Sequence, residues 1–165
     1  MIDRLNKMLS RHEGKMLTPY KCPAGYLTIG IGHNIDTKGL PKQIKTYLDK
    51  YGQITNEMAD TLFEADVEDA ITDCHLIFPN FDYYTEDRQI ALIDLIFNMG
   101  NAKIRKGFPS FVRAVITGDW GLAADELKYS NGVTKNKLSD YWKQLHGEEK
   151  PDSRPAEIYQ MIKEG

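Results

Sequence analysis

The sequence predicts a mainly helical α+β fold, in which a small β-hairpin lobe is joined by a long helix to a larger helical lobe. Three observations support this class. Apolar residues recur at helical spacing through most of the 165-residue chain. A stretch rich in Tyr, Thr and Ile and punctuated by glycine, residues 17–36, is typical of a hairpin or of three short strands. An unusually long periodic segment, residues 56–78, could connect two lobes.

Residues 3–13 predict the first helix, because apolar residues recur there at helical spacing with charges between them. Gly14 ends this helix, so Glu13 lies at its C-terminal end. The strands that follow are short, and a sheet of that size must lie against helices to be stable. We therefore expect function at the exposed edge of the sheet rather than in its core.

The middle of the chain predicts a turn at 37–39, a short helix over about 41–50 and the long helix over 56–78. Thr55 is a suitable N-cap for the long helix, and Pro79 ends it. One aspartate, Asp66, falls beside the apolar stripe of this helix, where a carboxylate needs a partner.

The second half of the chain predicts helices only. The segment QIALIDLIFNMG, closed by Gly100, is apolar on nearly all sides and indicates a helix buried in the core. Shorter helices are predicted over about 108–116, 119–128, 137–145 and 155–163, and the polar stretch 146–153 predicts an exposed loop. We expect a single domain, 1–165, with a small lobe of about 14–54 and a helical lobe formed by 1–13 plus 79–165.

The composition excludes several classes of protein. A hydrophobic content of 41% with 27% charged residues is ordinary for a soluble globular domain. A net charge of -3 argues against a nucleic-acid partner, because neutralising phosphates needs a clustered excess of Lys and Arg. No apolar run resembles a signal peptide or approaches the roughly 20 residues of a membrane-spanning helix. We therefore expect a monomer that is made and kept in the cytoplasm without stable membrane insertion.

The cysteines and histidines do not form a recognisable ligand set. Cys22 and Cys74 are expected to be free, because the chain shows no export signal. Cys74 falls on an apolar helical stripe and predicts a small core residue. The four histidines are scattered without a metal-ligand spacing, so we expect neither a metal nor a cofactor.

The most specific motif runs from Glu13 to His33 and reads EGKMLTPYKCPAGYLTIGIGH. Glu13 is followed after eight residues by Cys22 and after five more by Thr28, directly before IGIGH. This pattern resembles the catalytic signature of the phage-type lysozymes, glycoside hydrolase family 24, in which an aspartate, or in some endolysins a cysteine, stands at the position of Cys22. The resemblance continues more thinly to the segment SRPAEIYQMIKEG, with poor agreement over 129–153.

The resemblance implies a lysozyme-like fold with a substrate cleft between its lobes. It also implies an endolysin-type muramidase, which hydrolyses the β-1,4 bond between N-acetylmuramic acid and N-acetylglucosamine in peptidoglycan without a cofactor. Such an enzyme would be made in the host cytoplasm and would reach the cell wall through a membrane lesion formed by a holin. The net charge of -3 is a mild point against this function, because bacterial walls are themselves anionic.

Glycosidic cleavage needs an acid that protonates the departing oxygen and a second group on the opposite face of the sugar. Glu13 suits the acid, because a helix C-terminus and partial burial both favour a protonated carboxyl group. Cys22 would act as the base on a water molecule, which inverts the anomeric centre, or as the nucleophile, which retains it; the family favours inversion. Thr28 would hold the attacking water. Without the resemblance, these residues would be a solvated helix end, a surface cysteine and an ordinary strand residue.

Five further residues have predicted roles in substrate binding or in the structure. By resemblance, Asn98, Trp142 and Arg154 are predicted to bind substrate, although Trp142 could instead be a core aromatic and Arg154 an exposed charge. His33 is predicted to form a structural pair with Asp66.

Two other functions remain open. One is a catalytically inactive peptidoglycan-binding module on the same fold, if Cys22 has ended catalysis. The other, which the sequence favours less, is a cysteine peptidase with Cys22 and His33 as its dyad, since no helix begins at Cys22 to activate it.

Overall fold

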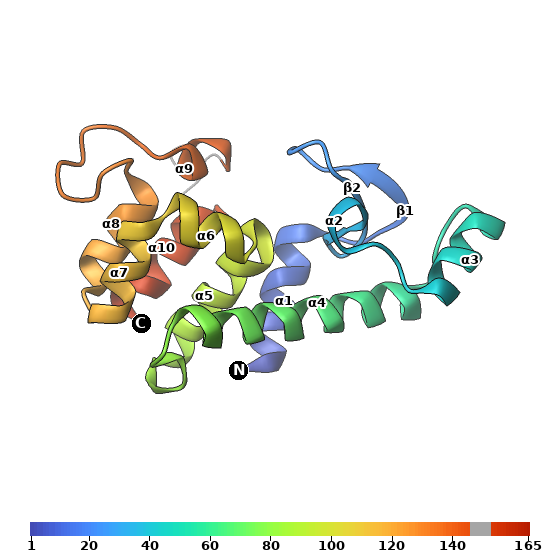
Figure 1. The fold of residues 1–165 in the computed structure, drawn as a ribbon, viewed down its shortest axis with the longest axis horizontal. Coiled ribbons are helices and arrows are strands. Elements are labelled where there is room, and N and C mark those ends of the chain that lie inside the picture. The colour runs from blue at the N-terminus through green and yellow to red at the C-terminus, as the bar shows by residue number, and fades with distance from the viewer. Residues whose placement is uncertain (146–152) are drawn as a thin grey trace. The chain divides into compact units, whose positions relative to one another are not determined.

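The computed structural model describes residues 1–145 and 153–165, so most of the predicted loop 146–153 lies outside the described residues. It confirms the mainly helical α+β class, because 67% of the described residues are helical and the strands form a small three-stranded sheet (Figure 1). The chain divides into two compact units. We call Ile2–Asp69 the N-terminal unit and Met1 with Ala70–Gly165 the C-terminal unit. This division groups the first helix with the sheet and falls inside the long helix.

The N-terminal unit surrounds a small antiparallel sheet in the order β1-β2-β3. Its elements are α1 (Ile2–Glu13), β1 (Met16–Lys21), β2 (Leu27–Gly30), β3 (His33–Asn34), α2 (Ile35–Lys38), α3 (Lys42–Tyr51) and the first part of α4 (Asn56–Ile77). The end of the predicted strand region is a helical turn instead, because the side chain of Asn34 caps α2 by accepting a hydrogen bond from the Thr37 amide, 3.1 Å away.

The core of the N-terminal unit lies against one face of this sheet. Its buried members are Ile29, Ile44, Ile54, Ala59 and Leu62, contributed by β2, α3, α4 and the segment between the two helices. Successive side chains of a strand point to opposite faces. Because Ile29 faces the core, its neighbour Thr28 lies on the other face, together with its cross-strand partner Tyr20. That other face carries the candidate site.

The C-terminal unit is helical around α5. After the end of α4 come the 3-10 helix η1 (Phe81–Tyr83), α5 (Glu86–Met99), α6 (Asn101–Gly107), α7 (Pro109–Thr117), α8 (Trp120–Lys128), α9 (Asp140–Gln144) and α10 (Arg154–Glu164). α5 is buried along the run Ile90–Ile96 and packs against α6 and α10, while α8 packs against α7, α9 and α10. α6 is absent from the predicted set, and the helix predicted over 137–145 is shorter because Tyr129 and Leu138 first form an antiparallel bridge.

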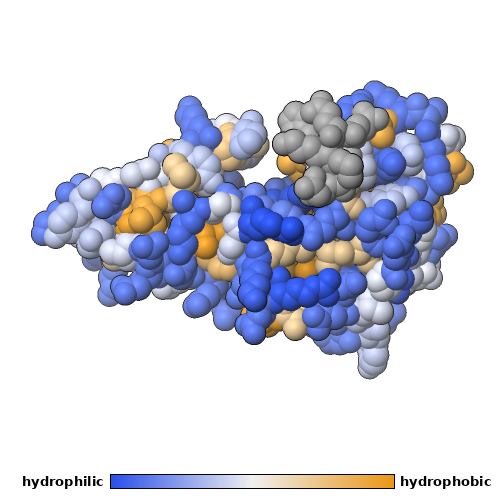
Figure 2. All heavy atoms as spheres, turned by 180° about the vertical axis from the view of Figure 1, so that it is seen from behind, coloured by the Kyte–Doolittle hydropathy of each residue, from blue (hydrophilic) through white to orange (hydrophobic). Residues whose placement is uncertain are grey.

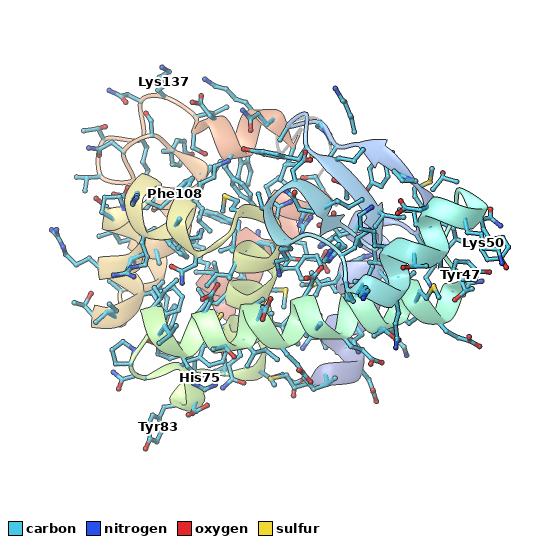
Figure 3. The ribbon with its side chains drawn as sticks, turned by 45° about the vertical axis from the view of Figure 1, so that its right-hand side comes forward. Tyr47, Lys50, His75, Tyr83, Phe108 and Lys137 are labelled. Atoms are coloured by element: carbon cyan, nitrogen blue, oxygen red, sulfur yellow. The ribbon has the colours of Figure 1, made fainter. Side chains whose placement is uncertain are left out.

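The face of the protein that Figure 2 shows is mostly hydrophilic. Figure 2 shows one face on which hydrophobic atoms occur in separate small patches among polar ones. In the part of the chain that the structure describes, no helix combines the length and the apolar character that crossing a membrane requires. In Figure 3 the side chain of Tyr83 projects away from η1, in agreement with its 89% exposure.

Candidate active site

Glu13 is held at the last position of α1 by close backbone contact. The helix ends because Gly14 adopts a φ of +69° while its amide still bonds the carbonyl of Ser10 at 3.0 Å. The half-buried Glu13 side chain then rests against Gly32, where an added Cβ would lie 3.0 Å from Oε2. Gly32 also has a φ of +74°, so glycine is required there for both conformation and space. The IGIGH segment therefore positions the predicted acid.

Cys22 follows the last residue of β1 in a tight turn. Its carbonyl accepts a hydrogen bond from the Gly25 amide at 2.8 Å, and its own amide donates to the Tyr26 carbonyl at 3.0 Å. Gly25 has a φ of +87°, which closes the turn. The thiol is free and half-buried. These bonds fix the backbone from which the sulfur projects.

Thr28 is linked to Cys22 through one carbonyl group. Its Oγ1 donates a hydrogen bond to the Tyr26 carbonyl at 3.1 Å, and this is the same oxygen that accepts the Cys22 amide. Thr28 is 3% exposed and lies on the central strand, between Tyr20 of β1 and Asn34 of β3. The hydroxyl proton of Thr28 is therefore used in the bond to Tyr26, while the lone pairs of Oγ1 can still accept a hydrogen bond from another group.

Tyr20 is influenced by the charges of both the predicted acid, Glu13, and the predicted base, Cys22. The sequence motif did not identify Tyr20. Burial raises the pKa of its phenol, and the negative charges of Glu13 and Cys22 both raise it further. Both groups are thus close enough to act on one side chain. The structure brings Glu13, Cys22 and Thr28 together in the N-terminal unit, with Tyr20 among them. The signal that identifies Tyr20 is its pairing opposite Thr28, which appears only in the folded sheet.

The structure also joins His33 to Asp66. His33 Nδ1 lies 2.8 Å from Asp66 Oδ2, and Nε2 lies 2.7 Å from the Gly39 carbonyl oxygen. Both partners are acceptors, so both bonds form together only when the imidazole is doubly protonated. Burial alone would lower the pKa of His33, but the hydrogen bonds to Asp66 and Gly39 and the charge of Asp66 outweigh it and raise the pKa. Lys38 completes the cluster, with Nζ 2.7 Å from Asp66 Oδ1.

The three residues predicted to bind substrate all belong to the C-terminal unit. Asn98 is exposed near the end of α5, whereas Trp142 is 4% exposed and packs edge-on against Tyr159 with ring centroids 5.8 Å apart. Arg154 donates from Nε to Asp94 Oδ1 at 2.7 Å, in an ion pair whose side chains are 9% and 0% exposed. Of the alternatives given above, the exposed charge is wrong for Arg154, which is buried in an ion pair. Trp142 is a core aromatic, as one of its two alternatives stated. Substrate contact by these residues stays a prediction.

The family described as phage lysozyme matches residues 10–143, a range that contains Glu13, Cys22 and Thr28. The chain belongs to the phage lysozyme family. Membership of this family supports a lysozyme-type glycosidase whose substrate is peptidoglycan.

Three curated relatives are similar to this chain, and two of them are described as probable T4-type lysozymes. The chain is 31% identical over 154 residues to the probable T4-type lysozyme 2 of Dictyostelium discoideum, covering 82% of this chain and 88% of that protein. It is 30% identical over 157 residues to the probable T4-type lysozyme 1 of the same organism, with 83% and 90% covered. It is also 36% identical over 151 residues to the pre-baseplate central spike protein Gp5 of Enterobacteria phage T4, covering 81% of this chain but 26% of that protein.

The position of His33 in this phage lysozyme family member weighs against a cysteine peptidase. A peptidase dyad needs an imidazole nitrogen that is free to take the thiol proton. Here both ring nitrogens of His33 are engaged, one by Asp66 and the other by Gly39. The free thiol of Cys22 is therefore not paired with this histidine.

We expect the pair of His33 and Asp66 to stabilise the fold in a pH-dependent way. The folded pKa of His33 is raised above its unfolded value of about 6.5, so the stabilisation is fully present below that value. It is lost as the pH rises through the raised folded pKa. Asp66→Asn should therefore cost about 3 kcal/mol in the free energy of unfolding at pH 5 and clearly less at pH 9. Urea denaturation between these pH values measures the difference.

The matched control for this prediction is Asp60→Asn. Asp60 pairs with Lys15 on the exposed surface of the same unit, and a lysine does not titrate in this pH range. The control should lose little stability at any pH. A constant cost of Asp66→Asn from pH 5 to pH 9 would contradict the assigned role of His33.

Proposed function

We propose that this chain is an endolysin-type muramidase that hydrolyses the β-1,4 bond between N-acetylmuramic acid and N-acetylglucosamine in bacterial peptidoglycan. One observation supports the proposal: in a chain of the phage lysozyme family, the charges of Glu13 and Cys22 both act on Tyr20, which is paired with Thr28 in the sheet. The proposal includes a monomer made in the host cytoplasm, which reaches the wall after a holin opens the membrane and then lyses the host cell.

Glu13 is the general acid in this proposal. Its carboxyl proton passes to the glycosidic oxygen while the bond from that oxygen to the anomeric carbon breaks. Cys22, as the thiolate, removes a proton from a water molecule whose oxygen bonds to the anomeric carbon from the opposite face. The negative charge thus moves from the sulfur to the Glu13 carboxylate, and the anomeric configuration inverts.

Thr28 orients the attacking water by accepting a hydrogen bond from it. Because Oγ1 donates to the Tyr26 carbonyl, it can meet a water molecule only as an acceptor. One water hydrogen then points to Thr28 and the other to Cys22, which leaves an oxygen lone pair free to attack. The shared Tyr26 carbonyl ties the backbone of Cys22 to the hydroxyl of Thr28.

Digestion of purified peptidoglycan tests the proposal. A muramidase clears the suspension and releases fragments with new reducing ends at N-acetylmuramic acid, which mass spectrometry identifies. A peptidase would instead release free peptide ends. A binding module would sediment with the wall without clearing it, and either of these results would contradict the proposal.

Substitutions of Cys22 test its role as the base. Cys22→Ser should lower the rate about 10²-fold or more, because a hydroxyl does not ionise near neutral pH, whereas Cys22→Asp should retain activity because a carboxylate can accept the proton. NMR of the first-formed anomer checks the stereochemistry, and retention would assign Cys22 as the nucleophile.

Cys74→Ala is the matched control. Cys74 is fully buried, and burial raises the pKa of its thiol, so it takes no part in proton transfer. This variant should lower the melting temperature but leave the activity of the folded protein unchanged. Full activity of Cys22→Ser would remove Cys22 from the mechanism.

A further inference from the structure

Tyr20 lies on the same face of the sheet as two of the proposed catalytic residues. It is directly opposite Thr28 in the β1–β2 ladder, so their side chains share a face. Cys22 follows directly after β1, and its amide donates to the Tyr26 carbonyl at 3.0 Å, so the pairing with the β2 side continues by one residue and the side chains of Tyr20 and Cys22 share a face. The third group, Glu13, approaches from the end of α1, since its charge acts on the Tyr20 phenol.

The hydroxyl of Tyr20 is available for a further interaction. The side chain is half-buried, and among the residues that the structure describes its hydroxyl has no hydrogen-bond partner. Burial and the charges of Glu13 and Cys22 raise the pKa of Tyr20, so the phenol stays neutral at any pH at which the proposed reaction runs. A neutral phenol beside two groups that can be anionic is suited to donate its proton to a hydrogen bond.

We propose that Tyr20 is a positioning residue whose hydroxyl donates a hydrogen bond to whichever of Cys22 and Glu13 carries the negative charge during the reaction. The inference rests on the proposed function. Before bond cleavage the charge is on the Cys22 sulfur and Glu13 is protonated; afterwards the sulfur holds the proton taken from water and Glu13 is the carboxylate. A single neutral donor near both groups stabilises each state without changing its own protonation.

Tyr20→Phe tests this inference through the reactivity of Cys22 toward iodoacetamide. The thiolate is the reacting form, so the rate of alkylation against pH reports its formation. Cys74 is 0% exposed, so alkylation of the native protein reports Cys22, and peptide mass spectrometry verifies the site. Loss of one hydrogen bond to the thiolate should move the midpoint of this curve about 0.5 to 1 pH unit upward. The value of kcat on peptidoglycan should fall about 3- to 10-fold with KM unchanged.

Tyr47→Phe is the matched control. Tyr47 is also half-buried, but it lies on α3, where Figure 3 labels it and its ring contacts Tyr51. It should leave the alkylation curve, kcat and KM unchanged. Phe keeps the ring of Tyr20 and suits a strand, and a melting temperature near that of the parent excludes a folding effect.

Two results would overturn the inference. One is an alkylation midpoint that is the same in Tyr20→Phe and in the parent protein. The other is a raised KM with an unchanged kcat, which would make Tyr20 a substrate contact. Alkylation requires no turnover of substrate. It therefore tests the hydrogen bond from Tyr20 to Cys22 even if the chain does not cleave peptidoglycan. Absence of cleavage by the parent protein contradicts the proposed function separately.

Discussion

Glu13→Gln should lower the rate of peptidoglycan clearing about 10²- to 10⁴-fold. Glutamine has nearly the same shape as glutamic acid, so it fits the half-buried site against Gly32. It has no acidic proton to give to the departing glycosidic oxygen, and the barrier to bond cleavage rises accordingly. The initial rate of turbidity loss of purified peptidoglycan, measured at saturating substrate, gives the size of the effect.

The control for this prediction is Glu68→Gln, which removes an exposed carboxylate from α4 of the same unit. It should keep the parent rate. A Glu13→Gln variant that clears peptidoglycan as fast as its parent would remove Glu13 from the mechanism. If the parent binds the wall without clearing it and the variant binds equally well, the chain is instead a binding module.

Asp94→Asn should produce the largest loss of stability among the substitutions considered for the C-terminal unit. Asp94 is 0% exposed, and its carboxylate accepts the Arg154 Nε proton at 2.7 Å. Asparagine there breaks this buried ion pair and takes one anion away from the Arg154 guanidinium, and breaking a buried pair typically costs about 3 to 5 kcal/mol. For a chain of this size, such a loss lowers the melting temperature by roughly 10 °C. Differential scanning calorimetry measures it directly.

Asp82→Asn provides the comparison in the same unit. Asp82 lies 3.7 Å from His75 with a side chain that is 76% exposed, so its removal should change the melting temperature little. Equal melting temperatures for Asp94→Asn and the parent would show that the ion pair is not a source of stability. A loss of activity without loss of stability would favour the predicted role of Arg154 in substrate binding.

The parts of the fold that the sequence predicts well are those with strong local signals. α4 begins after Thr55, whose hydroxyl accepts the Met58 amide at 3.1 Å, and it ends just before Pro79. α8 begins directly after Asp119, the first residue of the predicted helix 119–128, whose side chain accepts the Leu122 amide at 3.0 Å. In each case a side-chain cap or a proline marks the boundary, and such signals can be recognised without tertiary contacts.

The missed elements lack such signals. α6 follows Gly100 with no side-chain cap, and its sequence NAKIRKG shows no clear periodicity, so the tertiary contacts of its buried Ile104 stabilise it. Asp94 was overlooked because the run IALIDLIF indicates burial on all sides. Its partner Arg154 lies 60 residues away, and no local pattern identifies a contact at that separation.

The residues of the candidate site also fall into those with a local sequence signal and those without one. The spacing from Glu13 to Cys22 and Thr28 is local, and its resemblance to the family signature selected them. Tyr20 carries no motif of its own and becomes visible when the pairing of β1 with β2 places it opposite Thr28. The pairing register is a property of the folded sheet, which explains why the sequence alone did not identify this residue.

The contact between Gly32 and Glu13 restricts how this protein can evolve. Any side chain at residue 32 would displace the carboxyl group by contact at about 3.0 Å, although residue 32 carries no reactive group. Substitution of residue 32 is therefore restricted by its backbone conformation and by the nearby Glu13 side chain, and not by a chemical role of its own. Directed-evolution libraries for altered wall specificity should therefore keep this glycine constant and diversify positions whose backbone accepts ordinary side chains.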